Sequence, residues 1–271
     1  MSRALLKCLV VALLWGAFEA IIFLGMSNKL LLSDIVLLFG FSGISPNIGY
    51  IINLTIKLFP FLLFLILFGT YIYQHFSTAS IYYFTRQPNR TKWFMKEVAK
   101  LYVLSFLYPF IMVVSGTAIA SITNEVIFDS TSLILLIYYV LIHSFWLFLT
   151  ALLMNIISIR LDSSSGFMIV VGLQMTFVTL LLLWDKMLPL EEDTPNLAFH
   201  GFLLQFNPIS HIILSWHSSA ILEVNKRINQ FNITFSLNTS VVVLLLISMI
   251  VIFYGIYVVR EQEWISQDLE R

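Results

Sequence analysis

The sequence predicts an all-α integral membrane protein with six transmembrane helices, both termini in the cytoplasm and short interfacial or re-entrant helices in the outer loops. Composition is the first reason: 59% of the 271 residues are hydrophobic and 11% are charged, whereas soluble domains carry about a quarter charged residues. The second is that apolar runs of about eighteen residues or more recur along the chain, each long enough to cross a bilayer. The third is an uneven placement of Lys and Arg, which sets the orientation.

The apolar runs leave no stretch for a separate soluble domain, so residues 1–271 are expected to form one transmembrane domain. Span one covers residues 5–24 and starts in the cytoplasm, because Arg3 and Lys7 flank its beginning. It is too long for a signal peptide and has no small-residue cleavage site, so we expect it to be retained. The connection 25–48 holds an apolar piece, broken by glycines and a proline, that is too short to cross the membrane. We expect this piece to be re-entrant or interfacial on the outer side.

The other five spans follow from the same criteria. Span two covers residues 49–73, with a kink expected at Pro60. The short turn 123–131 contains acidic residues but no Lys or Arg, which places it outside. Ten of the fifteen basic residues fall on the predicted inner side. The remaining spans cover residues 101–122, 132–159, 167–184 and 239–259.

The polar interval 185–238 is expected to form an outer cap. Two short amphipathic pieces, Leu197–Phe206 and Ile209–Leu222, would reach only about 15 Å and 21 Å as helices, against a core of about 30 Å. Asn207 and Pro208 separate them. We therefore expect two interfacial helices, with the histidines of the second piece, His211 and His217, as polar tips at the membrane surface.

The connection 74–100 is the most distinctive segment. It contains Arg86, Arg90 and three lysines, with only Glu97 to offset them, and is therefore predicted to be a cytoplasmic loop. Pro88 predicts a turn, and Thr91 is placed as the N-cap of a following helix. The apolar face of that helix would comprise Trp93, Phe94, Val98 and Leu101.

Motifs for chemistry are absent. No GxxxxGK[ST] loop occurs, so the chain is not expected to hydrolyse ATP, and no HExxH motif marks a metalloprotease. An intramembrane protease of the CAAX type would need a pair of glutamates with a following Arg, but Glu191 and Glu192 are followed by Asp193, Thr194, Pro195 and Asn196. The single cysteine, Cys8, cannot form an internal disulfide or a CxxC pair. No metal site and no catalytic residue are predicted, and no extended basic patch outside 74–100 suggests a nucleic-acid partner.

Two charged residues lie deep inside predicted spans. Glu19 lies in span one and Lys57 in span two, at similar depth. A charge in the membrane is expensive unless it is paired, so a Glu19–Lys57 pair joining the two spans is the first hypothesis. A contact between Glu19 and a cationic substrate, or a protonated Glu19, remains open.

The basic connection resembles one known family. Its sequence pattern is similar to that of ABC type-2 exporter permeases, within the same six-span layout. The residues that carry the resemblance are Tyr82, Tyr83, Phe84, Arg86, Pro88, Arg90, Trp93, Phe94, Lys96 and Lys100.

The resemblance implies a permease subunit in a bacterial cytoplasmic membrane, with ATP and Mg²⁺ bound by a separate ABC ATPase subunit in two copies. A second permease copy would complete the transporter. The implied cargo is a hydrophobic or cationic peptide, as in bacteriocin or lantibiotic export or self-immunity, while lipids, lipid-linked glycans and drugs remain open. The residues that would dock on the ATPase are Phe76, Ile81, Tyr82, Tyr83, Phe84, Arg86 and Arg90.

Two other readings remain open. The basic connection is also explained if it only fixes topology. A non-transporting membrane protein for immunity or peptide sensing would need no ATPase. A membrane-embedded hydrolase lacks its motifs.

Overall fold

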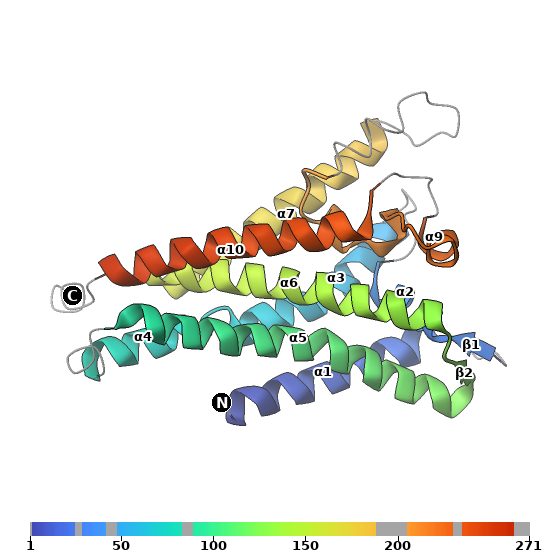
Figure 1. The fold of residues 1–271 in the computed structure, drawn as a ribbon, viewed down its shortest axis with the longest axis horizontal. Helices are drawn as coiled ribbons and strands as arrows, with labels where there is room; N and C mark the ends of the chain where they lie inside the picture. Colours follow the sequence, from blue (N-terminus) through green and yellow to red (C-terminus); the bar gives the residue numbers. More distant parts are fainter. Residues whose placement is uncertain are drawn as a thin grey trace.

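The long helices lie side by side in one elongated bundle (Figure 1). The structure, a computed structural model, describes residues 2–24, 29–41, 48–82, 89–187, 205–229 and 235–262, without the side chains of 2, 48–56, 79–82 and 182–187. The long helices are α1 (Ser2–Phe23), α3 (Ile48–Phe68), α4 (Tyr71–Tyr82), α5 (Arg90–Thr123), α6 (Ser130–Arg160), α7 (Ser163–Met187) and α10 (Leu237–Glu261). The short elements are β1 (Lys29–Leu31), α2 (Leu32–Phe39), β2 (Glu125–Ile127), the 3-10 turns η1 (Ser210–Ile212) and η2 (Leu214–Trp216), and α9 (Leu222–Ile228).

Six helical segments in the described ranges are long and apolar enough to cross a membrane. This confirms the predicted all-α membrane protein with six candidate spans, while its orientation in the membrane stays a prediction. The segments are Arg3–Phe23, Lys57–Thr78, Arg90–Thr123, Ser130–Arg160, Ser163–Leu181 and Leu237–Glu261.

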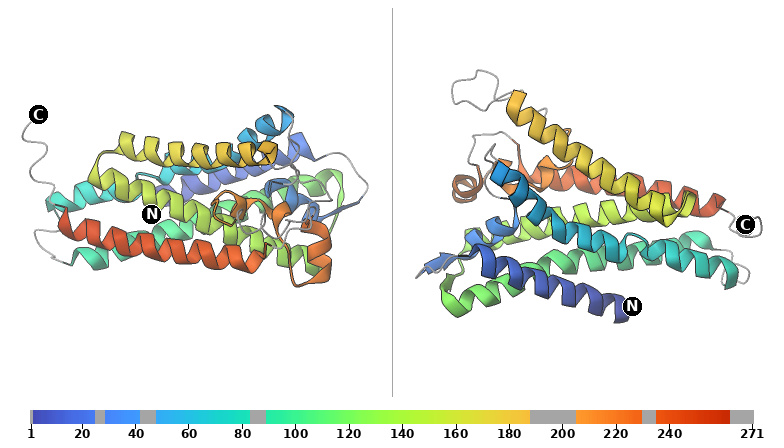
Figure 2. Two further views of the ribbon diagram at one scale, coloured as in Figure 1. Left: turned by 90° about the horizontal axis from the view of Figure 1, so that it is seen from above. Right: turned by 180° about the vertical axis from the view of Figure 1, so that it is seen from behind.

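Helix α6 lies at the centre of the bundle. It packs against α5, α7 and α10 along its length and also contacts α2, α3 and α4 (Figure 2). Its side chains are apolar nearly all round, which is the pattern of a helix covered on every side. Helix α7, in contrast, packs mainly against α6 and diverges from the other helices toward its C-terminal end.

Helices α1 and α5 approach each other closely because glycine occupies the contact. A Cβ added at Gly16 would clash with the Met112 carbonyl oxygen and the Ser115 hydroxyl of α5. Gly116 faces the Phe39 ring of α2, where an added Cβ would lie 2.6 Å from a ring carbon. Small residues at such contacts let helix backbones pack without side chains between them, as is common in membrane bundles.

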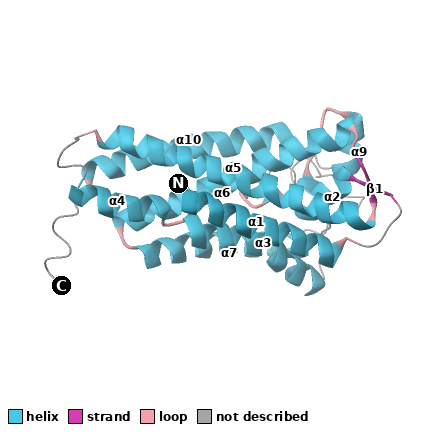
Figure 3. Ribbon diagram, turned by 90° about the horizontal axis from the view of Figure 1, so that it is seen from below, coloured by secondary structure: helices cyan, strands magenta, loops and turns pink. Residues whose placement is uncertain are grey.

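The bundle has two distinct ends (Figure 3). We call the end with β1, β2, α2 and α9 the strand end, and the end with α4 and the start of α5 the hairpin end. β1 and β2 pair in parallel, with Lys29 opposite Glu125 and Leu31 opposite Ile127. The sequence did not predict these strands, because three residues are too few for alternation to be recognised.

Arg227 of α9 fastens the strand end. Its Nη2 lies 3.1 Å from Asp129 Oδ2, and its Nη1 donates hydrogen bonds to the hydroxyls of Ser33 and Ser132. Because Ser33 belongs to α2 and Ser132 to α6, one guanidinium joins three helices.

The predicted helix over Ile209–Leu222 is wrong. Residues 209–217, which we call the strap, form two 3-10 turns that are buried along their whole length instead of lying on the membrane surface. An interfacial helix would expose one face to water or lipid, whereas every residue from 209 to 217 is buried. The strap is held by Leu214 N, which donates to Gly40 O at 3.1 Å, and by the Ser215 hydroxyl, which donates to Phe41 O at 3.3 Å. The first predicted cap helix, Leu197–Phe206, lies mostly outside the described residues.

The chain is helical on both sides of Pro60, and the kink expected there stays a prediction. The helix continues through Pro60, whose carbonyl accepts a hydrogen bond from Tyr108 Oη at 3.0 Å, and the interruption lies at 69–70, between α3 and α4.

Candidate functional site

The basic connection 74–100 is mostly a helical hairpin rather than a loop. α4 continues to Tyr82 and α5 begins at Arg90, so the helix of span three starts well before the predicted residue 101. The 34 residues of α5 extend over about 51 Å, against a hydrocarbon core of about 30 Å. The N-cap is Asn89, whose side chain accepts from Lys92 N at 3.0 Å, and the prediction of Thr91 as N-cap was therefore wrong by two positions.

Glu97 holds the hairpin together. The carboxylate is buried and lies 3.0 Å from His75 Nδ1 of α4 and 2.5 Å from Lys100 Nζ of α5. The sequence indicated only that Glu97 offsets neighbouring basic charge. Its position between the helices depends on a histidine 22 residues away, which the spacing did not reveal.

The predicted docking residues have different environments. Phe76 is fully buried between α4 and α5, with its ring centroid 5.8 Å from that of Trp93, so in this conformation it packs the hairpin and is not presented to a partner. Arg90 donates from Nη1 to the backbone oxygens of Arg260, at 3.3 Å, and Gln262, at 3.1 Å. Ile81 and Tyr82 lie in the last turn of α4, without described side chains. Tyr83, Phe84 and Arg86 lie outside the described residues.

Asn155 connects the hairpin to the centre of the bundle. This buried side chain of α6 accepts hydrogen bonds from Ile72 N at 2.6 Å and Tyr73 N at 3.0 Å, and donates to Phe68 O at 3.0 Å. These are backbone groups at the end of α3 and the start of α4, which have no partner within their own helices. Asn155 therefore closes the interruption between α3 and α4. The signal in the sequence is an amide side chain inside an apolar run.

Glu19 and Lys57 are both buried, with 1% and 5% of their surface exposed. They interact electrostatically, but the ion pairs within 4.0 Å among the described residues do not include them. Lys57 Nζ instead donates to the carbonyl of Leu38 at the end of α2. The predicted pair is thus brought together in the same region without direct contact.

Two further polar groups lie in this buried region. His143 of α6 is fully buried between the rings of Phe61 and Tyr139, with centroid distances of 5.5 Å and 4.1 Å. Within the described part of the chain, Glu19 Oε2, Tyr139 Oη and His143 Nε2 have no hydrogen-bond partner. Tyr139 also interacts electrostatically with Glu19. The sequence pattern contains no sign that His143 lies beside these groups.

The strap carries a second polar cluster. The Ser240 hydroxyl of α10 lies 3.0 Å from His211 Nδ1 and 2.7 Å from His217 Nε2. Each imidazole directs its other nitrogen to a backbone carbonyl, His211 to Gln205 O at 3.0 Å and His217 to Ile213 O at 2.8 Å. The prediction of interfacial polar tips was therefore wrong, because both histidines are buried and meet at one hydroxyl.

Burial determines the charge of this cluster. It lowers the pKa of His217 to about 3 and lowers the pKa of His211, so both imidazoles are neutral near pH 7. A carbonyl only accepts, so each distal nitrogen carries the proton and each nitrogen facing Ser240 is a lone pair. The single hydroxyl proton of Ser240 can serve only one of them at a time. Although Ser and His lie together, the hydroxyl is fully buried, which does not fit a nucleophile for a bulky substrate.

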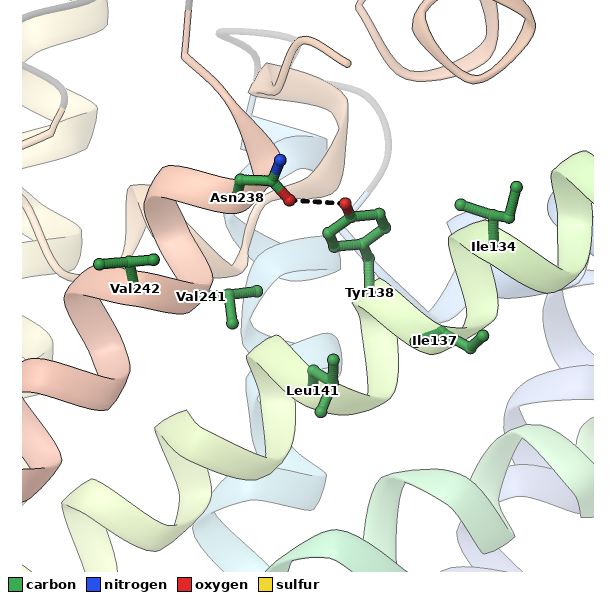
Figure 4. Close-up of a pocket in the computed structure, with 7 residues that line it drawn as sticks. All are labelled: Ile134, Ile137, Tyr138, Leu141, Asn238, Val241 and Val242. Carbon is green, nitrogen blue, oxygen red and sulfur yellow. Dashed lines mark hydrogen bonds between the residues drawn. The ribbon is translucent and has the colours of Figure 1, made fainter. Parts of the chain in front are cut away.

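A groove opens on the outside of the bundle between α6 and α10 (Figure 4). Its volume is about 400 Å³, and its one polar feature is the hydrogen bond from Tyr138 Oη to Asn238 Oδ1, at 2.6 Å. The remaining lining is aliphatic, from Ile134, Ile137, Leu141, Val241 and Val242.

In the described ranges no three His, Cys, Asp or Glu side chains are grouped to hold a metal ion. No family model, no curated protein and no solved structure matches the chain.

Proposed function

We propose that the chain is the transmembrane permease subunit of an ATP-driven ABC exporter of the type-2 class, in a bacterial cytoplasmic membrane. The observation that carries the proposal is the basic hairpin at one end of a bundle with six candidate spans. The chain has no phosphate-binding loop, so ATP and Mg²⁺ would be bound by two copies of a partner ATPase.

The hairpin suits a contact with such a motor. Lys92 and Lys96 are exposed on α5, in a segment that extends past the length needed to cross the hydrocarbon core. Glu97 links α4 to α5 through His75 and Lys100, so the two helices would move together when the ATPase displaces the hairpin. Asn155 passes that displacement to α6, because it is hydrogen-bonded to the backbone on both sides of the α3–α4 interruption.

The translocation path would lie between two permease copies. Helices α1, α7 and α10 keep most of their side chains outside the bundle and so provide the surface for a second copy or for lipid. The proposed cargo is a hydrophobic or cationic peptide. Export of a lipid, lipid-linked glycan or drug would use the same architecture.

Co-purification with the ATPase tests the proposal. Replacing Tyr82 and Tyr83 together by Ala is expected to release the ATPase, because a few buried aromatic and Arg side chains usually dominate such interfaces. The matched control is Ser77→Ala with Thr78→Ala, one turn earlier on α4, where both hydroxyls bond the Gln74 carbonyl. Size-exclusion chromatography shows whether each variant is folded.

Two results would contradict the proposal or part of it. If no ATPase copurifies with the wild-type chain from its native membrane, the alternative of a non-transporting immunity or peptide-sensing protein replaces it. If an ATPase copurifies but the tyrosine variant binds it as the control does, the exporter stands and this docking surface is wrong.

A further inference from the structure

A polar pocket lies at the hairpin end, between the N-terminus of α5 and the C-terminus of α10. It has a volume of about 490 Å³ and is lined by Asn89, Arg90, Thr91 and Arg260. Ligand pockets commonly measure about 300–1,000 Å³.

The charges around this pocket favour an anion. Arg90 donates to the last carbonyls of α10 and so offsets the negative end of that helix. Arg260 donates from Nε to Thr91 Oγ1 at 2.9 Å, which fixes the plane of its guanidinium. Among the described residues, the two terminal nitrogens of Arg260 make no hydrogen bond. The positive end of the α5 dipole adds to the field.

Tyrosine side chains beside the pocket indicate its position along the membrane normal. The Arg160 guanidinium lies over the rings of Tyr254 and Tyr257, 5.5 Å and 5.8 Å from their centroids. Tyrosines of membrane proteins gather at the boundary between hydrocarbon and headgroups. Arg260 follows Tyr257 by three residues, about 4.5 Å further along the helix. This places the pocket at the level of lipid phosphates.

An apolar stripe runs from the bundle surface to this pocket. Ile250, Phe253 and Tyr257 have 66%, 64% and 49% of their surface exposed. Their spacing of three and four residues puts them on one face of α10, and Arg260 continues that face. Acyl chains would lie along the stripe while the headgroup enters the pocket. A soluble phosphate or an acidic protein segment would use the arginines but not the stripe.

We propose that this pocket binds the phosphate of an anionic phospholipid, held by the forked guanidinium of Arg260 beside Arg90 and Thr91, with its acyl chains on α10. A guanidinium binds phosphate through two parallel hydrogen bonds, which an ammonium does not do. The site does not depend on the exporter function.

The test is lipid titration of the detergent-purified full chain, read as the shift of its thermal midpoint. Dioleoylphosphatidylglycerol is expected to stabilise the wild type, and dioleoylphosphatidylcholine is not. Arg260→Gln is expected to weaken the apparent affinity for the anionic lipid about tenfold or more, since it removes charge-assisted hydrogen bonds. Arg260→Lys should fall between the two, because it keeps the charge without the fork. Arg3→Gln, at the exposed start of α1 and away from the pocket, is the matched control and should keep the wild-type affinity.

Three outcomes overturn the proposal. In the first, Arg260→Gln titrates with the anionic lipid as the wild type does. In the second, glycerol 1-phosphate alone stabilises the wild type as strongly as the lipid, which makes the ligand a soluble phosphate. In the third, Arg260→Gln loses a copurifying protein while its lipid titration is unchanged. Should Arg260→Gln fail to fold, Thr91→Val carries the same test, because it removes only the acceptor that orients Arg260.

Discussion

The substitution Asn155→Leu tests whether Asn155 stabilises the interruption between α3 and α4. It replaces an amide by an apolar side chain of similar size, so the change in volume is small. It leaves the Ile72 and Tyr73 amides and the Phe68 carbonyl without the partner that Asn155 provides. Each unsatisfied buried group costs about 1–3 kcal/mol, so the three together cost about 3–9 kcal/mol. Whole domains are stable by only about 5–15 kcal/mol.

The assay is thermal unfolding of the purified chain in detergent. A loss of 3 kcal/mol lowers the midpoint by about 6 °C or more for a chain of this size. Hydrogen exchange at Ile72 and Tyr73 should accelerate in the same variant, because both amides lose their acceptor.

Asn238→Leu is the matched control for this substitution. Asn238 is exposed and accepts one hydrogen bond, from Tyr138 Oη, so its replacement should shift the midpoint far less. Equal midpoints for the two variants would refute the argument that Asn155 closes the interruption between α3 and α4.

Three other substitutions or conditions test the remaining clusters. Glu97→Gln should cost about 1.5–3 kcal/mol and make the hairpin more sensitive to protease, because a buried carboxylate loses charged partners on both helices; unchanged proteolysis would argue against the clamp. Glu19→Gln and Lys57→Met should be non-additive by about 0.5–3 kcal/mol in a double-mutant cycle of thermal unfolding, and simple additivity would rule out their coupling. Acidification should loosen the strap: the pKa values of His211 and His217 are lower in the fold than unfolded, so the unfolded state binds more protons and stability falls as pH drops below about 6.5. Hydrogen exchange of residues 209–217 that stays constant from pH 7 to 5, after correction for intrinsic rates, would contradict this.

The composition and the apolar runs predicted the class of the protein and the number of candidate spans. Both depend on the hydrophobicity of individual segments and not on contacts between them. Boundaries were less accurate where a helix leaves the membrane. α5 begins at Arg90 rather than at residue 101, since charged residues end a hydrophobic run without ending a helix. The burial of Glu19 and Lys57 was also predicted, although their direct contact was not found.

What the sequence missed depends on partners far along the chain. The strap looks amphipathic by itself, yet it is buried against α6, α9 and the two residues that follow α2, and Ser240 lies 29 residues from His211. Asn155 reads as one amide in an apolar run until the backbone 83 residues earlier is placed beside it. Periodicity describes a single element and carries no information about such pairings.

The attachment of α1 to α5 has a mechanical consequence. Gly16 of α1 lies directly against the Met112 backbone and the Ser115 hydroxyl of α5, and at the strand end β1, which follows α1, pairs with β2, which follows α5. A single contact would let one helix rotate about it relative to the other. Two contacts at separate points along the helix axis resist both rotation and sliding of α1 against α5. We therefore expect α1 and α5 to move together as a rigid pair. A change in the shape of the bundle would then occur at the contacts of this pair with α3 and α6.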